Sequence, residues 1–409
     1  MMPDERTRDA DKRRRIAVVT VGRSDFSILK PLVERIALCK EFDVGFWVGG
    51  AHYDPDAGET IDDVRASGLP IWAEVKSAGY GTGPEGTVRS MAEQLEGYGL
   101  IAAQEPGADL AIILGDRFEA ISAGLALVPF GLPIAHISGG SVTEGAIDDV
   151  FRHCLTKMAA LHFCDIPEFA RRIHQMGEPT ERIFTVGALG LDGISSHRPN
   201  TYPDFARHFD LGVEFGPEYA IATLHPETRA PGSNRLMAEA MVAALVETGR
   251  PTIYTYPNAD PGSEEIVEVI EAAAKSNDNH HVVRNFGSKW FYTAMEHAGF
   301  MIGNSSSGII EAASFGLPVV DIGDRQKGRF HGKNVLHCGR TRSGILEAVR
   351  RVTTDTVRKD CKHMINPYGD GRAAERIVET IRKLRWDWLC EPKPFAHLQS
   401  SFTGTAVEF

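Results

Sequence analysis

The sequence predicts an α/β protein built from two doubly wound, parallel-sheet (Rossmann-like) domains with a cleft between them. Short apolar runs alternate with helical patterns along both halves of the chain, which is typical of parallel sheets covered by helices. With 409 residues, the chain is too long for one ordinary hydrophobic core. A stretch rich in Pro, Gly, Ser, Asp and Asn, at about residues 193–219, interrupts the alternation and indicates a linker.

These patterns divide the chain into consecutive segments. The first 14 residues are charged and aperiodic, which predicts a disordered arm. The segments that follow are an N-terminal α/β domain (15–195), a linker (196–218), a C-terminal nucleotide-binding α/β domain (219–370), a helix (371–388) and a tail (389–409).

In the N-terminal half, each predicted strand is a short apolar run and each predicted helix carries apolar residues at helical spacing. The first strand, residues 15–20 (RIAVVT), turns through residues 21–25 into a helix that begins at Phe26. Later strands are predicted, with helices between them, at residues 43–50, 70–75, 111–114, 133–137, 161–166 and 182–188.

The C-terminal half repeats the alternation without repeating the sequence. Its long helices, such as residues 233–249 and 263–276, have the apolar spacing of helices packed on a sheet. An amphipathic helix at residues 371–386 closes the pattern. The predicted strands are residues 220–224, 252–256, 281–285, 300–304 and 318–323.

Composition and charge are those of a soluble globular protein, with 43% hydrophobic and 24% charged residues. No apolar run approaches the ~20 residues of a membrane span, and no apolar segment follows the charged start, so we expect a cytoplasmic protein that does not bind membranes. The net charge of -11 argues against a nucleic-acid partner. Six scattered cysteines without CxxC spacing indicate reduced thiols.

Charged side chains follow two strands of the N-terminal half. Asp116 and Arg117 come directly after one apolar run, and the next strand carries His136 and ends at Ser138. Because open α/β sheets bind ligands at the carboxyl ends of their strands, we expect these groups to meet at one place. The helix that follows adds carboxylates, cations and a histidine: Asp148, Asp149, Arg152, His153 and Lys157.

In the C-terminal half, the motif GNSSSG at residues 303–308 leads directly into a predicted helix. Free backbone N–H groups and the helix dipole favour an anion there, and Ser305 and Ser306 can hydrogen-bond it. An ordinary N-cap explains one serine, whereas three serines between two glycines favour a phosphate site. Glu311 lies two turns inside the same predicted helix, where a carboxylate can bind a ribose, although an isolated Glu is more often a solvated surface residue.

Two further strand ends in this half carry charged groups. Residues 324–329 (DRQKGR) follow a strand, and three cations there favour a diphosphate, since each charge-assisted hydrogen bond contributes roughly 1.5–3 kcal/mol. His225 follows the strand at residues 220–224 and is expected to face Asp116 and Asp148 across the cleft. A strand-end histidine is as often structural as chemical.

Two other patterns carry no site. The G-x-G-x-x-G match at residues 81–86 lies on the wrong βα unit and contains Pro84, so we interpret it as a loop and not as a dinucleotide site. The histidines do not pair at i, i+4 with a third ligand at a metal-binding spacing. We therefore expect no metal and no cofactor.

The motifs GDRFEA, AHISGGSVTEGAIDD, RHCLTKM, VGALGLD, TLHPET, GNSSSGIIEA, FGLPVV, IGDRQKGR and YGDGRAAERI occur in this order between Arg15 and about Arg382. As a set they resemble the hydrolysing UDP-N-acetylglucosamine 2-epimerases, which start the synthesis of sialic and related nonulosonic acids. The resemblance implies a GT-B-like fold, a nucleotide held mainly by the C-terminal domain, a last helix that crosses back to the first domain, and a homodimer or homotetramer.

The resemblance also implies a chemistry. UDP leaves by elimination across the first and second sugar carbons to give a 2-acetamidoglucal, and water then adds to yield the free manno-configured sugar, ManNAc. Carboxylates suffice as bases, because departure of UDP builds oxocarbenium character that acidifies the neighbouring C–H.

The resemblance assigns roles by position. Asp116 and Asp148 would be the acid/base residues, with Arg117 and His225 on the diphosphate or the leaving oxygen. His136 would also contact the substrate. The other substrate-binding residues would be Arg23, Ser27, Ser305, Ser306 and Arg325 on the phosphates, Glu311 on the ribose and Asn258 at the nucleotide.

The chain departs from this pattern at two positions. Relatives of this kind commonly carry Glu or His where this chain has Ser138, and Glu where it has Ser141. A serine does not supply a proton with a pKa near neutrality, even if Ser138 still contacts the substrate. Protonation would then fall to Glu144, Asp148 or a water, or the substrate would be a UDP-2,4-diacetamido-2,4,6-trideoxy sugar of the legionaminic acid pathway.

Three alternatives remain open. A non-hydrolysing 2-epimerase typically has H-x-E-A-G and P-E-E-x-N-R where this chain has HISGGS and IDDVFRH. A GT-B glycosyltransferase would need an acceptor surface and no Asp116/Asp148 pair. A regulator that only binds a nucleotide sugar is favoured by Ser138 and Ser141 but opposed by the retained acidic pair and His225.

Overall fold

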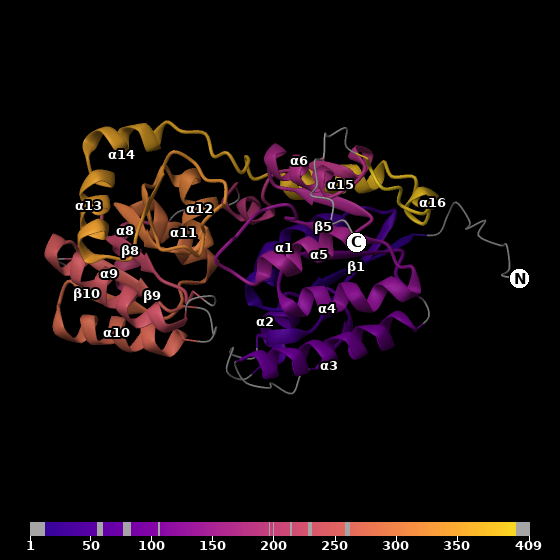
Figure 1. Ribbon diagram of the computed structural model, residues 1–409, viewed down its shortest axis with the longest axis horizontal. Helices are drawn as coiled ribbons and strands as arrows, with labels where there is room; N and C mark the ends of the chain where they lie inside the picture. Colours follow the sequence, from indigo (N-terminus) through magenta and orange to yellow (C-terminus); the bar gives the residue numbers. More distant parts are fainter. Residues whose placement is uncertain are drawn as a thin grey trace, which may run out of the picture.

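The computed structural model describes residues 13–397, apart from residues 55–59, 77–82, 105–106, 196, 199, 213–214, 228–230 and 258–261. Two lobes lie side by side along the longest axis, each built around one parallel sheet with helices packed against it (Figure 1). This confirms the predicted α/β class with two parallel-sheet domains.

The N-terminal lobe contains a seven-stranded sheet in the order β3-β2-β1-β4-β5-β6-β7, with every pair parallel. All five residues of the central strand β4 are buried, as a strand covered on both faces requires. The strands are β1 (Arg14–Thr20), β2 (Phe42–Val48), β3 (Ile71–Glu74), β4 (Leu110–Leu114), β5 (Ile134–Ile137), β6 (Leu161–Cys164) and β7 (Ile183–Thr185).

The helices of this lobe connect successive strands. They are α1 (Arg23–Ala37), α2 (Ile61–Ala66), α3 (Pro84–Ala102), α4 (Phe118–Leu127), α5 (Asp148–Met158) and α6 (Pro167–Gln175). Most strand boundaries differ from the sequence prediction by a few residues, as do the starts of some helices. Strand β1 begins at Arg14, α1 begins at Arg23 and not at Phe26, and α3 begins at Pro84, so the end of the glycine motif predicted as a loop is helical. Proline is well suited to a first helical turn, because its missing N–H has no partner there.

The C-terminal lobe contains a six-stranded parallel sheet in the order β10-β9-β8-β11-β12-β13. Its strands are β8 (Ala220–Thr223), β9 (Thr252–Thr255), β10 (His280–Val283), β11 (Phe300–Gly303), β12 (Val319–Ile322) and β13 (Val335–Cys338). Its helices are α9 (Asn234–Thr248), α10 (Ser263–Ser276), α11 (Gly287–His297), α12 (Ser306–Ile310), α13 (Arg342–Val352) and α14 (Asp355–Lys362). The sequence analysis missed β13, α13 and α14; β13 is a short, partly exposed edge strand with a weak apolar signal.

The segment predicted as a linker, residues 196–218, contains the helix α8 (Tyr202–His208), and the short helix α7 (Asp192–Ser195) directly precedes it. Phe205 of α8 is fully buried and its ring stacks on Tyr219, with 5.8 Å between centroids and 5° between planes. The Thr201 hydroxyl caps α8 by accepting from the backbone N–H of Asp204. The polar residues that suggested a linker therefore include a helix N-cap.

The last helices, α15 (Ala373–Arg382) and α16 (Trp386–Leu389), return to the N-terminal lobe (Figure 1). Ala373, Ile377 and Ile381 lie one turn apart and are buried in the same hydrophobic cluster as α1 and β1. The carboxylate of Asp192 accepts the backbone N–H groups at the start of α15, at 2.8 and 2.7 Å.

Beyond α16, the described part of the tail contacts the N-terminal lobe. The Lys393 ammonium lies 2.6 Å from a carboxylate oxygen of Glu178, whose side chain is completely buried. Residues 1–12 of the predicted arm and residues 398–409 of the tail lie outside the described residues.

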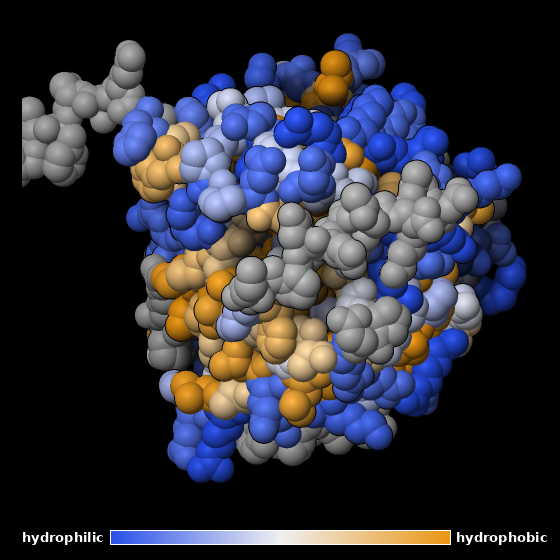
Figure 2. Space-filling model, turned by 90° about the vertical axis from the view of Figure 1, so that its right-hand side faces the viewer, coloured by the Kyte–Doolittle hydropathy of each residue, from blue (hydrophilic) through white to orange (hydrophobic). Residues whose placement is uncertain are grey.

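Apolar side chains gather on the end of the N-terminal lobe that Figure 2 faces. Exposed large apolar residues of the adjacent helices α3 and α4 and of the turn after α4 are Val88, Leu95, Leu100, Leu125, Val128 and Phe130. Within the part of the chain that the structure describes, no helix is long and apolar enough to cross a membrane.

Candidate active site

Three neighbouring strands of the N-terminal sheet, β4, β5 and β6, end in polar residues. Asp116 follows β4, Ser138 follows β5 and Asp165 follows β6. Because the strands are parallel and adjacent, these residues form a row at the carboxyl edge of the sheet. The sequence analysis named the first two and missed Asp165, although it follows an apolar strand just as Asp116 does.

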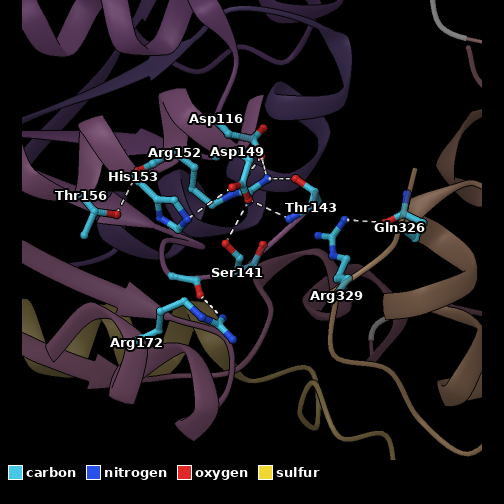
Figure 3. A network of polar contacts seen from close by, with 12 residues as sticks. Asp116, Ser141, Thr143, Asp149, Arg152, His153, Thr156, Arg172, Gln326 and Arg329 are labelled. Carbon is cyan, nitrogen blue, oxygen red and sulfur yellow. Dashed lines mark hydrogen bonds and ion pairs between the residues drawn. The ribbon is translucent and has the colours of Figure 1, made fainter. Parts of the chain in front are cut away.

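Arg152 of α5 connects the acidic groups of this edge (Figure 3). It is only 2% exposed, and its Nε donates to Asp116 Oδ2 at 2.9 Å. Its Nη1 donates to Asp149 Oδ1 at 3.0 Å and to the carbonyl of Ser141 at 3.0 Å. Its Nη2 donates to Thr143 Oγ1 at 3.0 Å and also to Asp116. One buried cation thus serves two carboxylates from different elements.

This arrangement keeps Asp116 ionised. Burial by itself would raise the pKa of Asp116, but the charge of Arg152 and its hydrogen bonds outweigh burial and hold that pKa below its ordinary value. A carboxylate in this state can accept a proton from a reacting group.

On its own helix, Arg152 forms an ion pair with Asp149. Asp149 Oδ1 also accepts the backbone N–H of Thr143 at 2.7 Å, which ties the preceding loop to the start of α5. Asp148 is half-buried, and its charge also acts on Arg152. Asp149 lies three residues and Asp148 four residues before Arg152, so both face it on the helix and the sequence spacing alone does not distinguish them.

His136 lies inside the fold. It is completely buried, with Nε2 2.8 Å from the carbonyl oxygen of Gly115 and Nδ1 3.2 Å from Thr156 Oγ1. Burial lowers its pKa to about 4. This geometry lets His136 hold the turn that precedes Asp116, and its predicted contact with the substrate stays a prediction.

Ser138 and Asp165 form a pair beside this network. Ser138 Oγ donates to Asp165 Oδ1 at 2.8 Å. Asp165 is only 5% exposed, and burial raises its pKa to about 6. Ser138 has a φ of 63°, a left-handed backbone that costs a non-glycine residue of order 1–3 kcal/mol.

Arg117 lies at the same edge, on the side towards β1. Its guanidinium forms a bidentate ion pair with Glu119, in which Nε donates to Oε2 at 3.1 Å and Nη2 donates to Oε1 at 3.0 Å. The Glu119 side chain is buried. Its charge also acts on Asp25 in the first turn of α1, where burial raises the pKa of Asp25 to about 7. Arg23 and Ser27 of the same helix are exposed, and Ser27 Oγ donates to the Arg23 carbonyl at 3.0 Å.

In the C-terminal lobe, the ends of β8 and β11 are joined through His225 and Asn304. The backbone N–H of His225 donates to Asn304 Oδ1 at 2.6 Å, and Asn304 Nδ2 donates to the backbone carbonyl of His225 at 2.9 Å. Arg325 Nη1 donates to the Asn304 carbonyl at 3.1 Å. Burial, followed by the charge of Arg325, holds the pKa of His225 well below its ordinary value, so its imidazole is neutral.

The serine motif caps a short helix. Ser305 Oγ accepts the backbone N–H of Ser307, and the half-buried Ser306 is the first residue of α12. The helix ends at Ile310, so Glu311 is its C-cap and does not lie inside a longer helix as predicted. Within the described structure, Glu311 Oε2 is buried without a hydrogen-bond partner, and burial raises the pKa of Glu311 to about 7.

The two lobes meet between the loop before α5 and the loop after β12. The Glu144 N–H donates to the Lys327 carbonyl at 3.1 Å, and the exposed side chains of the two residues lie 3.7 Å apart. A Cβ added at Gly145 would lie 2.4 Å from the carbonyl oxygen of Asp324. Glu144 therefore lies at the contact between the lobes.

Arg329 extends from the C-terminal lobe towards this network (Figure 3). Its Nη1 donates to Gln326 Oε1 at 3.1 Å, and its Nε is buried without a partner in the described structure. Its positive charge acts on Asp116 and Asp165 of the N-terminal lobe and on Glu311 of its own lobe. A cation from one lobe thus faces the acidic edge of the other.

The remaining predicted residue, Asn258, lies outside the described residues. Across the part of the chain that is described, no group of three or more His, Cys, Asp and Glu side chains could hold a metal ion.

Comparison with known proteins identifies relatives that match almost the whole chain. The UDP-N,N'-diacetylbacillosamine 2-epimerase (hydrolyzing) of Legionella pneumophila is 29% identical to this chain, over 91% of this chain and 96% of its own length. The polysialic acid biosynthesis protein P7 of Escherichia coli is 27% identical, over 90% of this chain and 94% of its own length.

A crystal structure of UDP-GlcNAc 2-epimerase from Neisseria meningitidis bound to UDP-GlcNAc superposes with a TM-score of 0.77 at 15% identity, covering 90% of this chain and 100% of that one. This similarity confirms the GT-B-like arrangement of the two domains. The family model for UDP-N-acetylglucosamine 2-epimerase matches residues 35–382, and this chain therefore belongs to that family.

Proposed function

We propose that this protein is a hydrolysing 2-epimerase, which converts a UDP-2-acetamido sugar and water into UDP and the free 2-epimeric sugar. The observation that carries this proposal is the pair of carboxylates, Asp116 and Asp149, held by Arg152 at the carboxyl edge of the sheet and faced by Arg329 from the other lobe. Ionised carboxylates opposite a cation suit a reaction that removes a proton from carbon while an anionic leaving group departs.

In the first step, a carboxylate removes the proton from the second sugar carbon as the bond between the first carbon and the UDP oxygen breaks. Asp116 is the candidate for this base, because its pKa is lowered and it lies at the end of the central strand. Asp148 and Asp149 begin the adjoining helix, and Asp149 shares the guanidinium of Arg152 with Asp116. The product of this step is the 2-acetamidoglucal, and water adds to it in the second step.

The leaving UDP is assigned to the cations and hydroxyls of both lobes. In this proposal the phosphates are bound by Arg23, Ser27, Arg117, Ser305, Ser306 and Arg325, and the ribose by Glu311. The neutral imidazole of His225 would lie at the leaving oxygen, where its low pKa makes it a hydrogen-bond partner and not a second fixed charge. Arg329 would add a further cation close to the diphosphate.

Two sugars are candidates for the substrate. UDP-N-acetylglucosamine would yield ManNAc for sialic acid synthesis. A UDP-2,4-diacetamido-2,4,6-trideoxy sugar is favoured by the similarity to the Legionella pneumophila protein, whose name specifies UDP-N,N'-diacetylbacillosamine. Serine at positions 138 and 141 is a further reason to test the second sugar.

The test is to incubate the protein with each UDP-sugar in heavy water and follow the sugar by proton NMR. The proposal expects UDP and a free 2-epimeric sugar carrying deuterium at its second carbon. A UDP-linked epimer would instead support a non-hydrolysing enzyme, and binding of both sugars without turnover would support a regulator; either result would overturn the proposal.

A further inference from the structure

The proposed reaction needs a proton donor as well as a base, and the Arg152 network does not provide one. Asp116 and Asp149 both accept hydrogen bonds from the buried guanidinium of Arg152, and the pKa of Asp116 is lowered. A carboxylate held ionised in this way accepts a proton readily but seldom carries one to donate near neutral pH. The other acid in the row at this edge of the sheet is Asp165.

Asp165 follows β6, and its hydrogen bond with Ser138 connects it to the neighbouring strand end. The Asp165 carboxylate is 5% exposed, whereas Ser138, 2.8 Å away, is only half-buried. Ser138 follows β5, which lies between the strands that carry Asp116 and Asp165. The left-handed backbone of Ser138, at φ 63°, sets the direction of its side chain at an energetic cost.

Four titratable or charged groups act on Asp165 or respond to its charge. They come from four segments: Cys164 on β6, Arg152 on α5, Arg329 after β12, and Tyr368 before α15. The two guanidinium groups and the Ser138 hydrogen bond favour the carboxylate, but burial opposes them and is the larger effect, so the pKa of Asp165 rises to about 6. Asp165 is therefore able to carry a proton close to neutral pH.

The hydroxyl of Ser138 responds to this proton. A hydroxyl donates to a carboxylate but accepts from a carboxylic acid. When Asp165 is ionised, Ser138 points its hydrogen at Asp165. When Asp165 is protonated, Asp165 donates to Ser138, and the serine hydrogen is released towards the site.

We propose that Asp165 supplies, through the Ser138 hydroxyl, the proton that the second sugar carbon receives when water adds to the glycal. This inference rests on the proposed function. As Asp165 gives its proton to Ser138 Oγ, the serine gives its own to the second carbon, and the double-bond electrons form the new C–H bond. Water attacks the cationic first carbon, and the proton that it loses restores Asp165. The proton removed in the first step leaves with UDP.

Three other acids near the cleft lie in different surroundings. Asp25 lies beside Arg117 and Glu119. It belongs to α1, which follows β1, and β1 and β5 lie on opposite sides of β4. Glu311 belongs to the C-terminal lobe, and the exposed Glu144 lies against Lys327. In the described structure, the Ser138 hydroxyl donates to Asp165.

The test uses Asp165→Asn, which keeps the size of the side chain but cannot carry the proton. UDP release is measured by chromatography, and the glycal and free sugar are measured by proton NMR in heavy water. We expect UDP release to stay near the wild-type rate, hydration to slow by about 100-fold or more, and the glycal to accumulate. Glu178→Gln removes another buried carboxylate of the same lobe and should hydrate normally.

The pH profile provides a second readout. In the wild type, hydration should fall as pH rises above about 6, because Asp165 loses its proton, and this decline should be absent in Asp165→Asn. Ser138→Ala leaves only a water to carry the proton from Asp165, so hydration should slow. The decline should move to higher pH, since the variant removes a hydrogen bond that lowers the pKa of Asp165.

The possible outcomes are distinct. Wild-type hydration with an unchanged pH profile in Asp165→Asn overturns this inference and leaves the proposed function intact. Loss of UDP release in a folded Asp165→Asn protein also overturns it, because Asp165 would then act in the first step. If Asp165→Asn does not fold, an unshifted pH profile in Ser138→Ala overturns the inference. Absence of UDP release from the wild type with either sugar contradicts the proposed function itself.

Discussion

At the scale of single residues, the site depends on how one buried cation is shared. Arg152 is almost completely buried and would be costly to desolvate without partners. Asp116, Asp149 and Thr143 provide those partners, so the strand end, the helix and the loop between them are held in one geometry. The same contacts lower the pKa of Asp116, so one set of interactions both orients the proposed base and keeps it ionised.

Asp116→Asn tests the role of this base. The amide keeps hydrogen-bonding capacity towards Arg152 but cannot accept a proton, so we expect turnover to fall by about 100-fold or more while UDP binding stays unchanged. UDP release and isothermal titration with UDP measure the two quantities. Asp204→Asn, at a surface carboxylate paired with Arg207, serves as the control. Undiminished turnover in Asp116→Asn would remove this residue from the mechanism.

At the scale of elements, two segments that looked like connections prove to be packed structure. The helix α8 inserts Phe205 among the aromatic rings of the C-terminal lobe, including Tyr219 and Phe286. The tail after α16 is fixed by Lys393, whose ammonium contacts the buried carboxylate of Glu178. Both contacts join residues far apart in the sequence, where local patterns carry no information about them.

Phe205→Ala tests whether α8 is structural. Deleting a fully buried aromatic ring should lower the free energy of unfolding by about 3–5 kcal/mol, because a cavity remains in a packed cluster. Denaturant titration measures the change. Leu38→Ala, at a side chain that is 84% exposed, should have almost no effect. Equal stability of the two variants would contradict the packed position of Phe205.

The anchor of the tail should respond to pH. Glu178 accepts from Lys157, Lys393 and His162, and although burial opposes them, these partners lower its pKa from 4.5 to about 2. Because the folded-state pKa is the lower one, this contribution is fully present above pH 4.5 and is lost as pH falls towards 2. The contribution of Glu178 to the free energy of unfolding amounts to ~3 kcal/mol.

The measurement compares the free energy of unfolding at pH 7 and pH 3 for the wild type and Glu178→Gln. The variant should be less stable at pH 7 and should lose less stability on acidification. Equal acid sensitivity of the two proteins would show that Glu178 does not contribute in this way.

At the scale of the whole molecule, the site requires the two lobes to approach closely. The loop before α5 contacts the loop after β12 through the Glu144 and Lys327 backbones, and Arg329 brings positive charge to the acidic edge. The absence of a side chain at Gly145 permits this approach, since a Cβ there would lie 2.4 Å from the Asp324 carbonyl.

Gly145→Ala should separate the loops and lower kcat/KM for the UDP-sugar by about tenfold, corresponding to ~1.4 kcal/mol of lost transition-state stabilisation. The melting temperature should change little, because neither hydrophobic core is touched. Gly212→Ala, where an added Cβ meets nothing within 4 Å, is the matched control. Wild-type kinetics in Gly145→Ala would show that this close approach is not needed for turnover.

The predicted homodimer or homotetramer remains a prediction at this scale. The exposed apolar residues of α3 and α4 in the described structure identify a surface to examine, and sedimentation velocity of the purified chain measures the assembly directly.

The sequence by itself determined the alternation of strands and helices, and therefore the two parallel sheets and the strand ends at which Asp116, Ser138 and His225 lie. Such features follow from local hydrophobic periodicity and from the rule that strand ends carry ligands. The tertiary structure decided which groups meet. It paired Arg152 with Asp149 and Asp116, buried His136, placed Glu144 at the lobe contact and brought Asp165 to Ser138. Apart from the i, i+3 pair of Asp149 and Arg152, these pairings and the burial of His136 depend on contacts between segments far apart in the sequence, which local sequence patterns do not reveal.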